Sequence, residues 1–359
     1  MSKFKILLVE DKKDEIEVYE SSIRRYKAEY EIDVETCIAQ SVSEAYTLLN
    51  NSYDGAIIDL KLEKDGDEGN QVIQQIHENF RIPIIVFSGT PDYFNSDKTY
   101  ILDICKKGEK SYEELISQLY NVYQTGLTKI MSGRGVIEQT MDKIFWNNLH
   151  SKIPIWETYV AKGHDTEKAL LRYTINHLLE LLDNEEDIYY PEEMYLSPPI
   201  VEHYQTGTIL REKSTRKLYL VLSPACDLVL HSGSCKTDRI LLCEINNRNM
   251  PFVKSSKKDL AKSDKEAKAI DRLSKLTNNT FTLYYHYLPP VEFFEGGFVN
   301  FRHVKSYKMK DLILEFEMEK VQISAQFIKD IIARFSVYYA RQGQPDFNRE
   351  DLYNRLVSL

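Results

Sequence analysis

The stretch FKILLVED, residues 4–11, decides the fold of the first part of the chain. Its first six residues are mostly apolar and β-forming, and they run directly into Glu10 and Asp11. A continuous apolar run of this length suits a strand buried on both faces, as the strands of parallel sheets are. The stretch therefore predicts a central strand over Phe4–Val9 with two carboxylates at its carboxyl end.

Further apolar runs and amphipathic segments alternate over the first 125 residues. The apolar runs predict strands at 32–38, 55–59, 82–87 and 100–105. The amphipathic segments predict helices at 13–27, 42–50 and 70–78, a short segment at 91–97, and a long helix from Ser111 toward residue 131. Ser111 and Glu114 have the spacing of a capping box, which marks the start of that last helix. Strands that alternate with helices predict a doubly wound α/β domain with a parallel sheet.

Chemically useful side chains follow the predicted strands at the edge where such sheets bind ligands. Carboxylates that meet there repel one another unless a cation is present, and Mg²⁺ is a hard cation that takes oxygen ligands. A hydroxyl and a lysine opposite the carboxylates predict a site for a phosphoryl group, with one aspartate as the nucleophile. The residues are Glu10 and Asp11 after the first strand, Asp59 after the third, Ser88 after the fourth, and Lys106 and Lys107 after the fifth.

Four segments in this order and spacing resemble the receiver domain of response regulators, the CheY-like family: FKILLVED (4–11), YDGAIIDL (53–60), IPIIVFSGT (82–90) and ICKKG (104–108). The resemblance covers residues 1–125 and implies a five-stranded parallel sheet of order 2-1-3-4-5. It implies that Asp59 accepts the phosphoryl group and that Ser88 and Lys107 bind it, with Lys106 as the alternative lysine. It further implies a Mg²⁺ ion held by Glu10, Asp11, Asp59 and the backbone carbonyl of Lys61.

The resemblance also implies a function and partners. A two-component response regulator receives its phosphoryl group from a histidine kinase or a phosphotransfer protein, controls a C-terminal effector, and forms a phosphorylation-dependent homodimer. By analogy, such a protein serves a stress or phage-defence system. The sequence departs from the family in lacking Met-Pro after the aspartate, in a loop Leu62–Glu68 about two residues longer than usual, and in Ile104 at the position of a switch aromatic. The alternative is a pseudo-receiver that is not phosphorylated.

The charge pattern changes after the first 125 residues. Residues 1–125 carry 14 Lys and Arg against 24 Asp and Glu, whereas the remainder carries 32 against 31. We expect a helical connector and linker over 126–199, with helices at 127–150 and 166–183 and a loop at 184–199, and an α+β effector domain over 200–359. Within the effector the patterns predict strands at 207–210, 218–223, 239–245, 280–287 and 298–301, a basic helix at 256–276 and an amphipathic helix at 324–341.

Residues 205–247 are similar to the start of the SH3-like barrel of MazF/PemK-type toxins. The similarity rests on TGTILREKSTRKLYLVLSPACDL (206–228) and DRILLCEIN (238–246). It predicts a barrel with helices as one form of the effector, and a toxin-like endoribonuclease gated by the receiver as an alternative function. Lys217 stands where the family has its catalytic arginine, and Asn246 or Asn247 replaces its hydroxyl. The effector candidates are Arg211, Lys217, Ser223, Cys226 and Asp227.

Cysteines and basic residues leave further alternatives open in this part. Cys226 is interpreted as a buried structural cysteine; the alternatives are a nucleophile paired with His203 or His231 and a zinc ligand beside Cys235 and Cys243. Residues 248–275 hold nine basic and four acidic residues, so the helix 256–276 is a candidate contact for RNA or DNA, or simply a solvated face. A nucleic-acid or protein binding module is thus another possible output.

Composition bounds the class of protein. The chain has 359 residues, is 43% hydrophobic and 28% charged, and carries a formal net charge of −9. Its apolar runs are far shorter than the ~20 residues that cross a bilayer, and Met1–Glu10 does not read as a signal peptide. Five scattered cysteines indicate a reducing compartment. We expect a soluble cytoplasmic protein without membrane contact.

Overall fold

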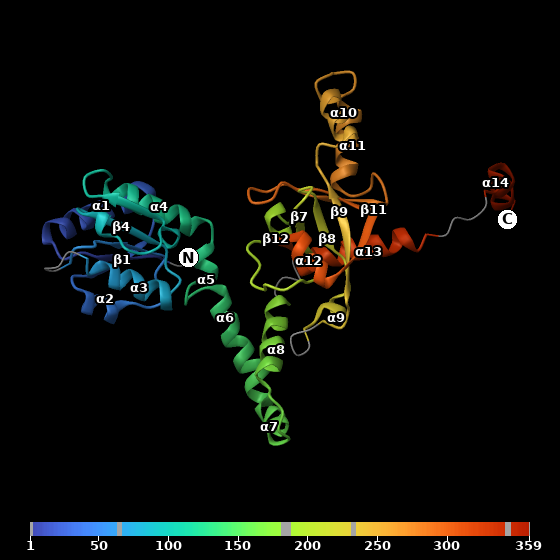
Figure 1. Cartoon of the computed structure of the whole chain (residues 1–359). Coiled ribbons are helices and arrows are strands. Elements are labelled where there is room, and N and C mark those ends of the chain that lie inside the picture. Colours follow the sequence, from blue (N-terminus) through green and yellow to red (C-terminus); the bar gives the residue numbers. More distant parts are fainter. Residues whose placement is uncertain (1–2, 63–66, 181–187, 231–234, 342–345, 359) are drawn as a thin grey trace. The chain divides into compact units, whose positions relative to one another are not determined.

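The computed structural model describes residues 3–62, 67–180, 188–230, 235–341 and 346–358 (Figure 1). Contacts divide the chain into two compact units, residues 1–186 and 187–359. Within the described ranges, no helix combines the length and the apolar content that a membrane span requires.

The first unit contains a five-stranded parallel sheet. Its strands are β1 (Phe4–Val9), β2 (Val34–Ala39), β3 (Gly55–Ile58), β4 (Ile84–Ser88) and β5 (Asp103–Lys106). They lie in the order β2-β1-β3-β4-β5, and every neighbouring pair is parallel. The predicted doubly wound sheet and the order 2-1-3-4-5 are therefore confirmed.

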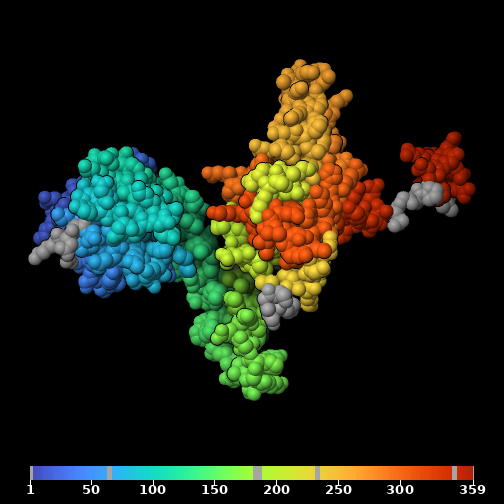
Figure 2. Space-filling model, in the orientation of Figure 1, coloured from blue at the N-terminus to red at the C-terminus, as the bar shows by residue number. Residues whose placement is uncertain are grey.

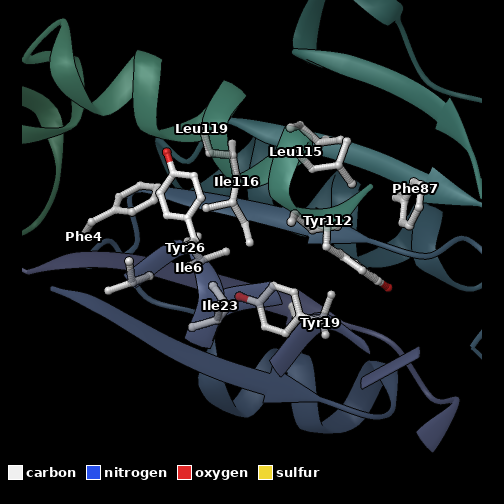
Figure 3. Close-up of a cluster of buried hydrophobic side chains, with 14 of the residues drawn as sticks. Phe4, Ile6, Tyr19, Ile23, Tyr26, Phe87, Tyr112, Leu115, Ile116 and Leu119 are labelled. Carbon is white, nitrogen blue, oxygen red and sulfur yellow. The ribbon is translucent and has the colours of Figure 1, made fainter. Parts of the chain in front are cut away.

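Helices cover both faces of this sheet because successive side chains of a strand point to opposite faces. One face packs against α1 (Lys13–Tyr30) and α4 (Tyr112–Gln124) in a core that includes Ile6, Leu115 and Leu119 (Figure 3). The other face, with Leu7 and Val9, packs against α2 (Val42–Leu48) and α3 (Gly69–Asn79). The capping box predicted at Ser111 and Glu114 is present at the start of α4.

Two predicted elements of this unit are present, but one boundary of each is wrong. Between β4 and β5 the chain forms only short 3₁₀ turns, at Pro91–Tyr93 and Lys98–Tyr100, so the expected fifth strand starts later, at Asp103. The helix from Ser111 ends at Gln124 instead of reaching residue 131. Gly126 has a φ of 87°, a left-handed conformation that glycine adopts readily and that ends a helix.

A helical arm follows the sheet, with its first helix at Leu127–Met131 (α5). It continues through α6 (Val136–Lys143), a π-helical turn and a 3₁₀ turn over 144–152, α7 (Ile153–Ala161) and α8 (Glu167–Leu179). Three contacts fix the start of the arm. Arg134 Nη2 lies 2.8 Å from Asp54 Oδ2, Arg81 Nε donates to the carbonyl of Met131 at 2.7 Å, and the Gly133 N–H donates to the carbonyl of Asn51 at 2.6 Å.

The second unit contains a separate seven-stranded sheet of order β10-β11-β9-β8-β7-β12-β6. Its paired strands are antiparallel, which matches the expected α+β class. The strands are β6 (Tyr195–Leu196), β7 (Thr208–Glu212), β8 (Leu218–Val221), β9 (Arg239–Asn246), β10 (Tyr285–Leu288), β11 (Gly297–Lys308) and β12 (Phe316–Ile323). The helices are α9 (Ala225–Leu228), α10 (Pro251–Leu260), α11 (Glu266–Thr277), α12 (Met309–Glu315), α13 (Ala325–Tyr339) and α14 (Arg349–Val357).

The structure corrects two expectations in this unit and adds a strand. The basic helix 256–276 is a hairpin of two helices, α10 and α11, and Figure 2 shows it standing out from the rest of the second unit. The segment 184–199 includes the strand β6, which pairs with β12, so it is not only a loop. The strand β12 was not predicted at all. The resemblance of residues 205–247 to a toxin barrel stays a prediction.

Candidate functional site

Three carboxylates meet where β1 and β3 end. Val9 is paired with Ile58, so the residues that follow them, Glu10 and Asp59, leave the sheet side by side. Both are buried, with 1% and 2% of their surface exposed. Asp11 joins them, and the three residues bring carboxylate oxygens within 4.8 Å of one another. The structure thus gathers the acidic residues that the sequence indicated.

Lys107, the residue that follows β5, closes this cluster. Its Nζ donates to Glu10 Oε2 at 2.5 Å and to Asp59 Oδ2 at 2.7 Å. Lys106, the alternative lysine, is exposed to solvent. Its backbone N–H donates to Glu109 Oε2 at 3.2 Å. Because side chains alternate along a strand, only one of two consecutive lysines faces the carboxylates, and here it is Lys107.

Burial and charge act against each other in the cluster. Burial raises the pKa of Glu10, and Asp59 raises it further, although Lys107 partly offsets both. Burial alone would lower the pKa of Lys107, but its hydrogen bonds to Asp59 and Glu10 outweigh burial and raise it, so the ammonium stays charged. Three ionised carboxylates against one ammonium leave two negative charges, which one divalent cation neutralises.

The donor set fits a hard cation. Asp11 Oδ1 is buried and has no hydrogen-bond partner among the described residues, and carboxylate oxygens are the ligands that Mg²⁺ prefers. Lys61 was expected to contribute its carbonyl. The structure shows its N–H donating to Asp59 Oδ1 at 3.2 Å, which holds the carboxylate in place; the role of the carbonyl stays a prediction.

Two hydroxyls stand at the end of β4. Ser88 is fully buried, and the Lys107 N–H donates to its carbonyl at 3.0 Å, so it lies beside the lysine in the fold. Its Oγ accepts a hydrogen bond from the N–H of Thr90 at 3.3 Å. The Thr90 hydroxyl is buried without a partner among the described residues. Sequence analysis missed Thr90 as a site residue, although its position two residues after Ser88 indicated a second hydroxyl at the end of the same strand.

Tyr112 was also missed as a neighbour of the site. It begins α4, and its ring packs edge-on against Tyr19 and Phe87 (Figure 3). Its hydroxyl donates to Glu15 Oε2 at 3.3 Å. Burial raises its pKa, and the negative charge of Glu10 adds to the effect. The sequence showed only an apolar helix position, which does not distinguish a core aromatic from one beside a site.

The start of α3 closes over Asp59. A Cβ at Gly69 would stand 2.2 Å from the carbonyl oxygen of Asp59 and 2.7 Å from Leu60 Cα, so only glycine fits there. Part of the longer loop Leu62–Glu68, residues 63–66, lies outside the described residues. Ile104 is partly buried and packs against the core on the α2–α3 face.

The effector candidates do not form one site. Arg211 Nε donates to Glu319 Oε1, whereas Lys217 Nζ lies 3.2 Å from Glu244 Oε2. Arg211 is paired with Leu218 across β7 and β8, so Lys217, one residue earlier, points to the opposite face of the sheet. The structure therefore separates the two basic residues.

The remaining candidates have other surroundings. Ser223 is buried, and its Oγ accepts a hydrogen bond from the N–H of Leu241 at 2.8 Å, a structural contact. Cys226 is exposed, with Sγ 3.7 Å from Asp227 Oδ1, so its interpretation as a buried cysteine is wrong. Within the described ranges, the only group of side chains spaced closely enough to hold a metal ion is the acidic triad of the first unit. The alternative zinc site of Cys226, Cys235 and Cys243 is therefore not formed in the described structure. His231 lies outside the described residues.

A polar network surrounds Glu244 instead. Its carboxylate accepts a hydrogen bond from Asn246 Nδ2 at 2.9 Å and lies 3.6 Å from His303 Nδ1. It sits where β9 and β11 lose register, between Val299 and Val304. Beside it opens a hollow of about 450 Å³ lined by polar and aromatic side chains: Asn246, Asn247, Asn249, Met250, Tyr284, Tyr285, Asn300, Arg302 and His303. Sequence analysis overlooked Glu244 because it lies within an otherwise apolar run.

Comparisons with known proteins found similarity to solved structures for the first part of the chain. No family model and no curated protein matches the sequence. Among solved structures, a response regulator from Thermotoga maritima is 16% identical over 34% of this chain and 99% of its own, with a TM-score of 0.26. A CheY-like receiver domain from Methylobacillus flagellatus is 17% identical over 33% of this chain and 99% of its own, with a TM-score of 0.28.

A third structure, the response regulator TrrA from Thermotoga maritima in complex with Mg²⁺ and BeF, is 20% identical over 33% of this chain and 98% of its own, with a TM-score of 0.27. These likenesses concern the fold. The strand order β2-β1-β3-β4-β5, with helices on both faces, is itself the arrangement of CheY-like receiver domains. The first third of the chain thus has the receiver fold.

Proposed function

We propose that the first unit is a phospho-acceptor receiver that regulates the second unit. The observation that carries this proposal is the convergence of Glu10, Asp11 and Asp59 with Lys107 at the carboxyl edge of the sheet. The donor is a histidine kinase or a phosphotransfer protein, as the receiver fold suggests. In this proposal the protein is a two-component response regulator.

The reaction transfers one phosphoryl group. A carboxylate oxygen of Asp59 forms a bond to phosphorus while the bond from phosphorus to the donor histidine nitrogen breaks, and that nitrogen keeps the electron pair. Asp59 suits this role because it is buried, is held by the Lys61 N–H, and has one oxygen paired with Lys107. Positioning and charge neutralisation supply most of the catalysis in such transfers.

Each neighbour has a defined part in the proposal. Glu10, Asp11 and Asp59 would hold Mg²⁺, which neutralises charge on the phosphoryl oxygens when bound. Lys107 would move its hydrogen bond from the carboxylates to a phosphoryl oxygen. Ser88 would donate its hydroxyl to another oxygen of the group, and Thr90 stands close enough to Ser88 to assist.

The added phosphoryl carries about −1.5 to −2 charges, so it alters a buried site strongly. Helix α4 starts beside the site with Tyr112 and leads at its other end into the helical arm through Gly126 and α5. We expect this path to carry the change toward the second unit and to strengthen self-association of the chain.

Phosphorylation is tested by incubating the full chain with acetyl phosphate and Mg²⁺ and mapping acyl phosphate by mass spectrometry. One phosphoryl group per chain, on the peptide that contains Asp59, is the expected result. Asp59→Asn serves as the matched control and should remain unmodified. An unmodified wild-type chain, or modification that persists in Asp59→Asn, would reject the phospho-acceptor and favour a pseudo-receiver.

A second candidate function concerns the polar hollow of the second unit. Arg302 lies over the ring of Tyr284 at 3.7 Å, close to His303 and Asn300, which offers a cation, an aromatic face and amide groups together. The lysine-rich hairpin α10–α11 begins at Pro251, next to Met250 in the lining. Stacking surfaces beside positive charge bind single-stranded nucleic acid, so RNA binding, with cleavage as in the toxin-like alternative, is the output that this site supports.

RNA binding is measured as the affinity of the full chain for a labelled single-stranded RNA at several salt concentrations. Arg302→Ala is expected to weaken binding by about tenfold, the loss of a cation and its stacked ring. Lys310→Ala, an exposed lysine of α12 away from the hollow, is the control. Equal affinity in all three proteins would exclude the hollow as the RNA site, and shortened RNA would identify cleavage.

A further inference from the structure

An apolar helical hairpin, residues 136–179, remains uncovered in the first unit. It comprises α6, the turns at 144–152, α7 and α8 (Figure 1). Lys152 Nζ donates to Tyr173 Oη at 2.6 Å, and the rings of Trp156 and Tyr173 lie 6.1 Å apart, so its two limbs contact each other. Within the described part of the chain, however, neither α7 nor α8 has a buried residue.

The exposed surface of this hairpin is unusually apolar. Helix α7 has one charged residue, Glu157, in nine, and a helix that is apolar around its whole circumference is normally buried. A hollow of about 560 Å³ along it is lined almost entirely by apolar side chains, among them Phe145, Trp156 and Val160. The exposed large apolar residues are Val136, Met141, Phe145, Trp146, Ile153, Ile155, Tyr159, Val160, Leu171, Ile175 and Leu179.

The charge of the hairpin indicates what covers it. Residues 136–179 carry five Lys and Arg and five Asp and Glu, whereas residues 1–125 have ten more acidic than basic residues. A surface with no net charge has no net electrostatic attraction for a nucleic acid or an acidic membrane, and it does not repel a copy of itself. Two identical hairpins with balanced charges therefore carry no net repulsion that would oppose the packing of their apolar surfaces.

The size of the hairpin also fits self-association. A stable interface takes about 20–30 residues from each partner, and the hairpin supplies 44 residues. Two helical hairpins packed face to face make a four-helix bundle, and the same patch on both copies gives a two-fold interface. Arg134 anchors the start of the hairpin to Asp54, which fixes where it leaves the receiver fold.

We propose that residues 136–179 bind a second copy of this chain through α7 and α8, forming a two-fold helical bundle. This interface is separate from the phospho-acceptor site and forms without phosphorylation. The chain's two tryptophans, Trp146 and Trp156, both lie in the hairpin, so their fluorescence reports on this surface alone.

The test measures the mass of the full, unphosphorylated chain by light scattering and follows tryptophan emission on dilution. We expect about twice 42.0 kDa at micromolar concentration, with emission shifting to the red as the dimer dissociates. Ile155→Glu and Val160→Glu change side chains that are 54% and 57% exposed, so the monomer should fold normally by circular dichroism. Each should raise the dissociation constant at least about tenfold.

Two matched variants complete the test. Val18→Glu alters an apolar residue of α1 that is 52% exposed, and it should dimerise like the wild type. Asp59→Asn should also dimerise, which separates this proposal from phosphoryl transfer. A wild-type chain of 42.0 kDa would overturn the proposal, including the case in which the second unit or a lipid surface covers the hairpin. A dimer that Ile155→Glu and Val160→Glu leave intact would overturn it as well.

Discussion

Lys107 holds the candidate site together at the scale of single residues. It is largely buried and touches two carboxylates, Glu10 and Asp59, that are almost fully buried. Removing one partner from a buried ion pair leaves an unpaired charge, which costs more than an exposed pair contributes. The lysine is thus both a phosphate ligand in the proposal and a structural counterion in the absence of phosphate.

Lys107→Ala is expected to lower the free energy of unfolding by about 3 kcal/mol in Mg²⁺-free buffer. Added Mg²⁺ should restore part of this loss, because the cation takes over the neutralisation of Glu10 and Asp59. Urea denaturation with and without Mg²⁺ measures both effects. Lys106→Ala, an exposed neighbour, should change stability by less than about 0.5 kcal/mol. Equal losses in the two variants would contradict the assigned contacts.

His286 predicts a pH effect in the second unit. It is buried, and burial lowers its pKa to about 3, with Arg334 adding to the effect; Asp330 Oδ2 lies 3.7 Å from Nδ1 but is exposed. In the unfolded chain the ring of His286 takes up a proton near pH 6.5, whereas in the folded chain the same ring stays neutral at that pH. Stability should therefore fall as the pH drops from about 6.5 toward 3, by up to about 1.4 kcal/mol per pH unit.

The measurement compares chemical denaturation of the wild type and His286→Gln at pH 7 and pH 5. The variant lacks the titrating ring, so its stability should depend less on pH. Identical pH dependence in the two proteins would show that His286 does not remain neutral in the folded chain.

At the scale of elements, the approach of α3 to β3 shapes the acceptor loop. Gly69→Ala would place a methyl group against the backbone of Asp59 and Leu60, so we expect a loss of about 1–3 kcal/mol in unfolding free energy and slower phosphorylation of Asp59. Gly89→Ala is the control, since apart from its own chain neighbours no described residue has an atom within 4 Å of its Cβ position. Denaturation and phosphorylation assays check both, and an unaffected Gly69→Ala would contradict the close approach.

The sequence predicted the elements of the first sheet well because parallel strands are continuous apolar runs with little ambiguity. Phe4–Val9 is found as predicted, and the site residues follow from where such strands end. Prediction from the sequence failed where a single residue overrides a periodic pattern, and where strand pairing decides the structure of a segment with a weak pattern. Gly126 ends α4 although the apolar spacing continues past it, and β12 alternates charged and apolar side chains only weakly, so its pairing with β7 decides its structure.

Contacts between distant residues were beyond the sequence. Glu244 meets Lys217 and His303 only because β8, β9 and β11 pair in a particular register, with an irregularity opposite the glutamate. Likewise, the segment 256–276 has a helical pattern throughout, and the turn after Leu260 follows from packing of Val253 and Leu276 on Phe298.

For the whole molecule, the start of the helical arm connects the receiver fold to the chain that follows. Asp54 is buried and accepts hydrogen bonds from the Lys5 N–H at 2.9 Å and from Arg134 at 2.8 Å. Arg134→Ala should lower the unfolding free energy by about 1–3 kcal/mol, because Asp54 loses a charged partner. Amide hydrogen exchange over 133–140 should accelerate, whereas Arg172→Ala, an exposed residue of α8, should leave it unchanged. Unchanged exchange in Arg134→Ala would argue against this anchor.

We propose that Asp59 accepts a phosphoryl group in a site completed by Glu10, Asp11 and Lys107. The most direct measurement is ³¹P NMR of the full chain with Mg²⁺ and phosphoramidate. We expect one acyl-phosphate resonance that requires Mg²⁺ and is absent in Asp59→Asn. A spectrum without that resonance, or one that Asp59→Asn leaves unchanged, would contradict it.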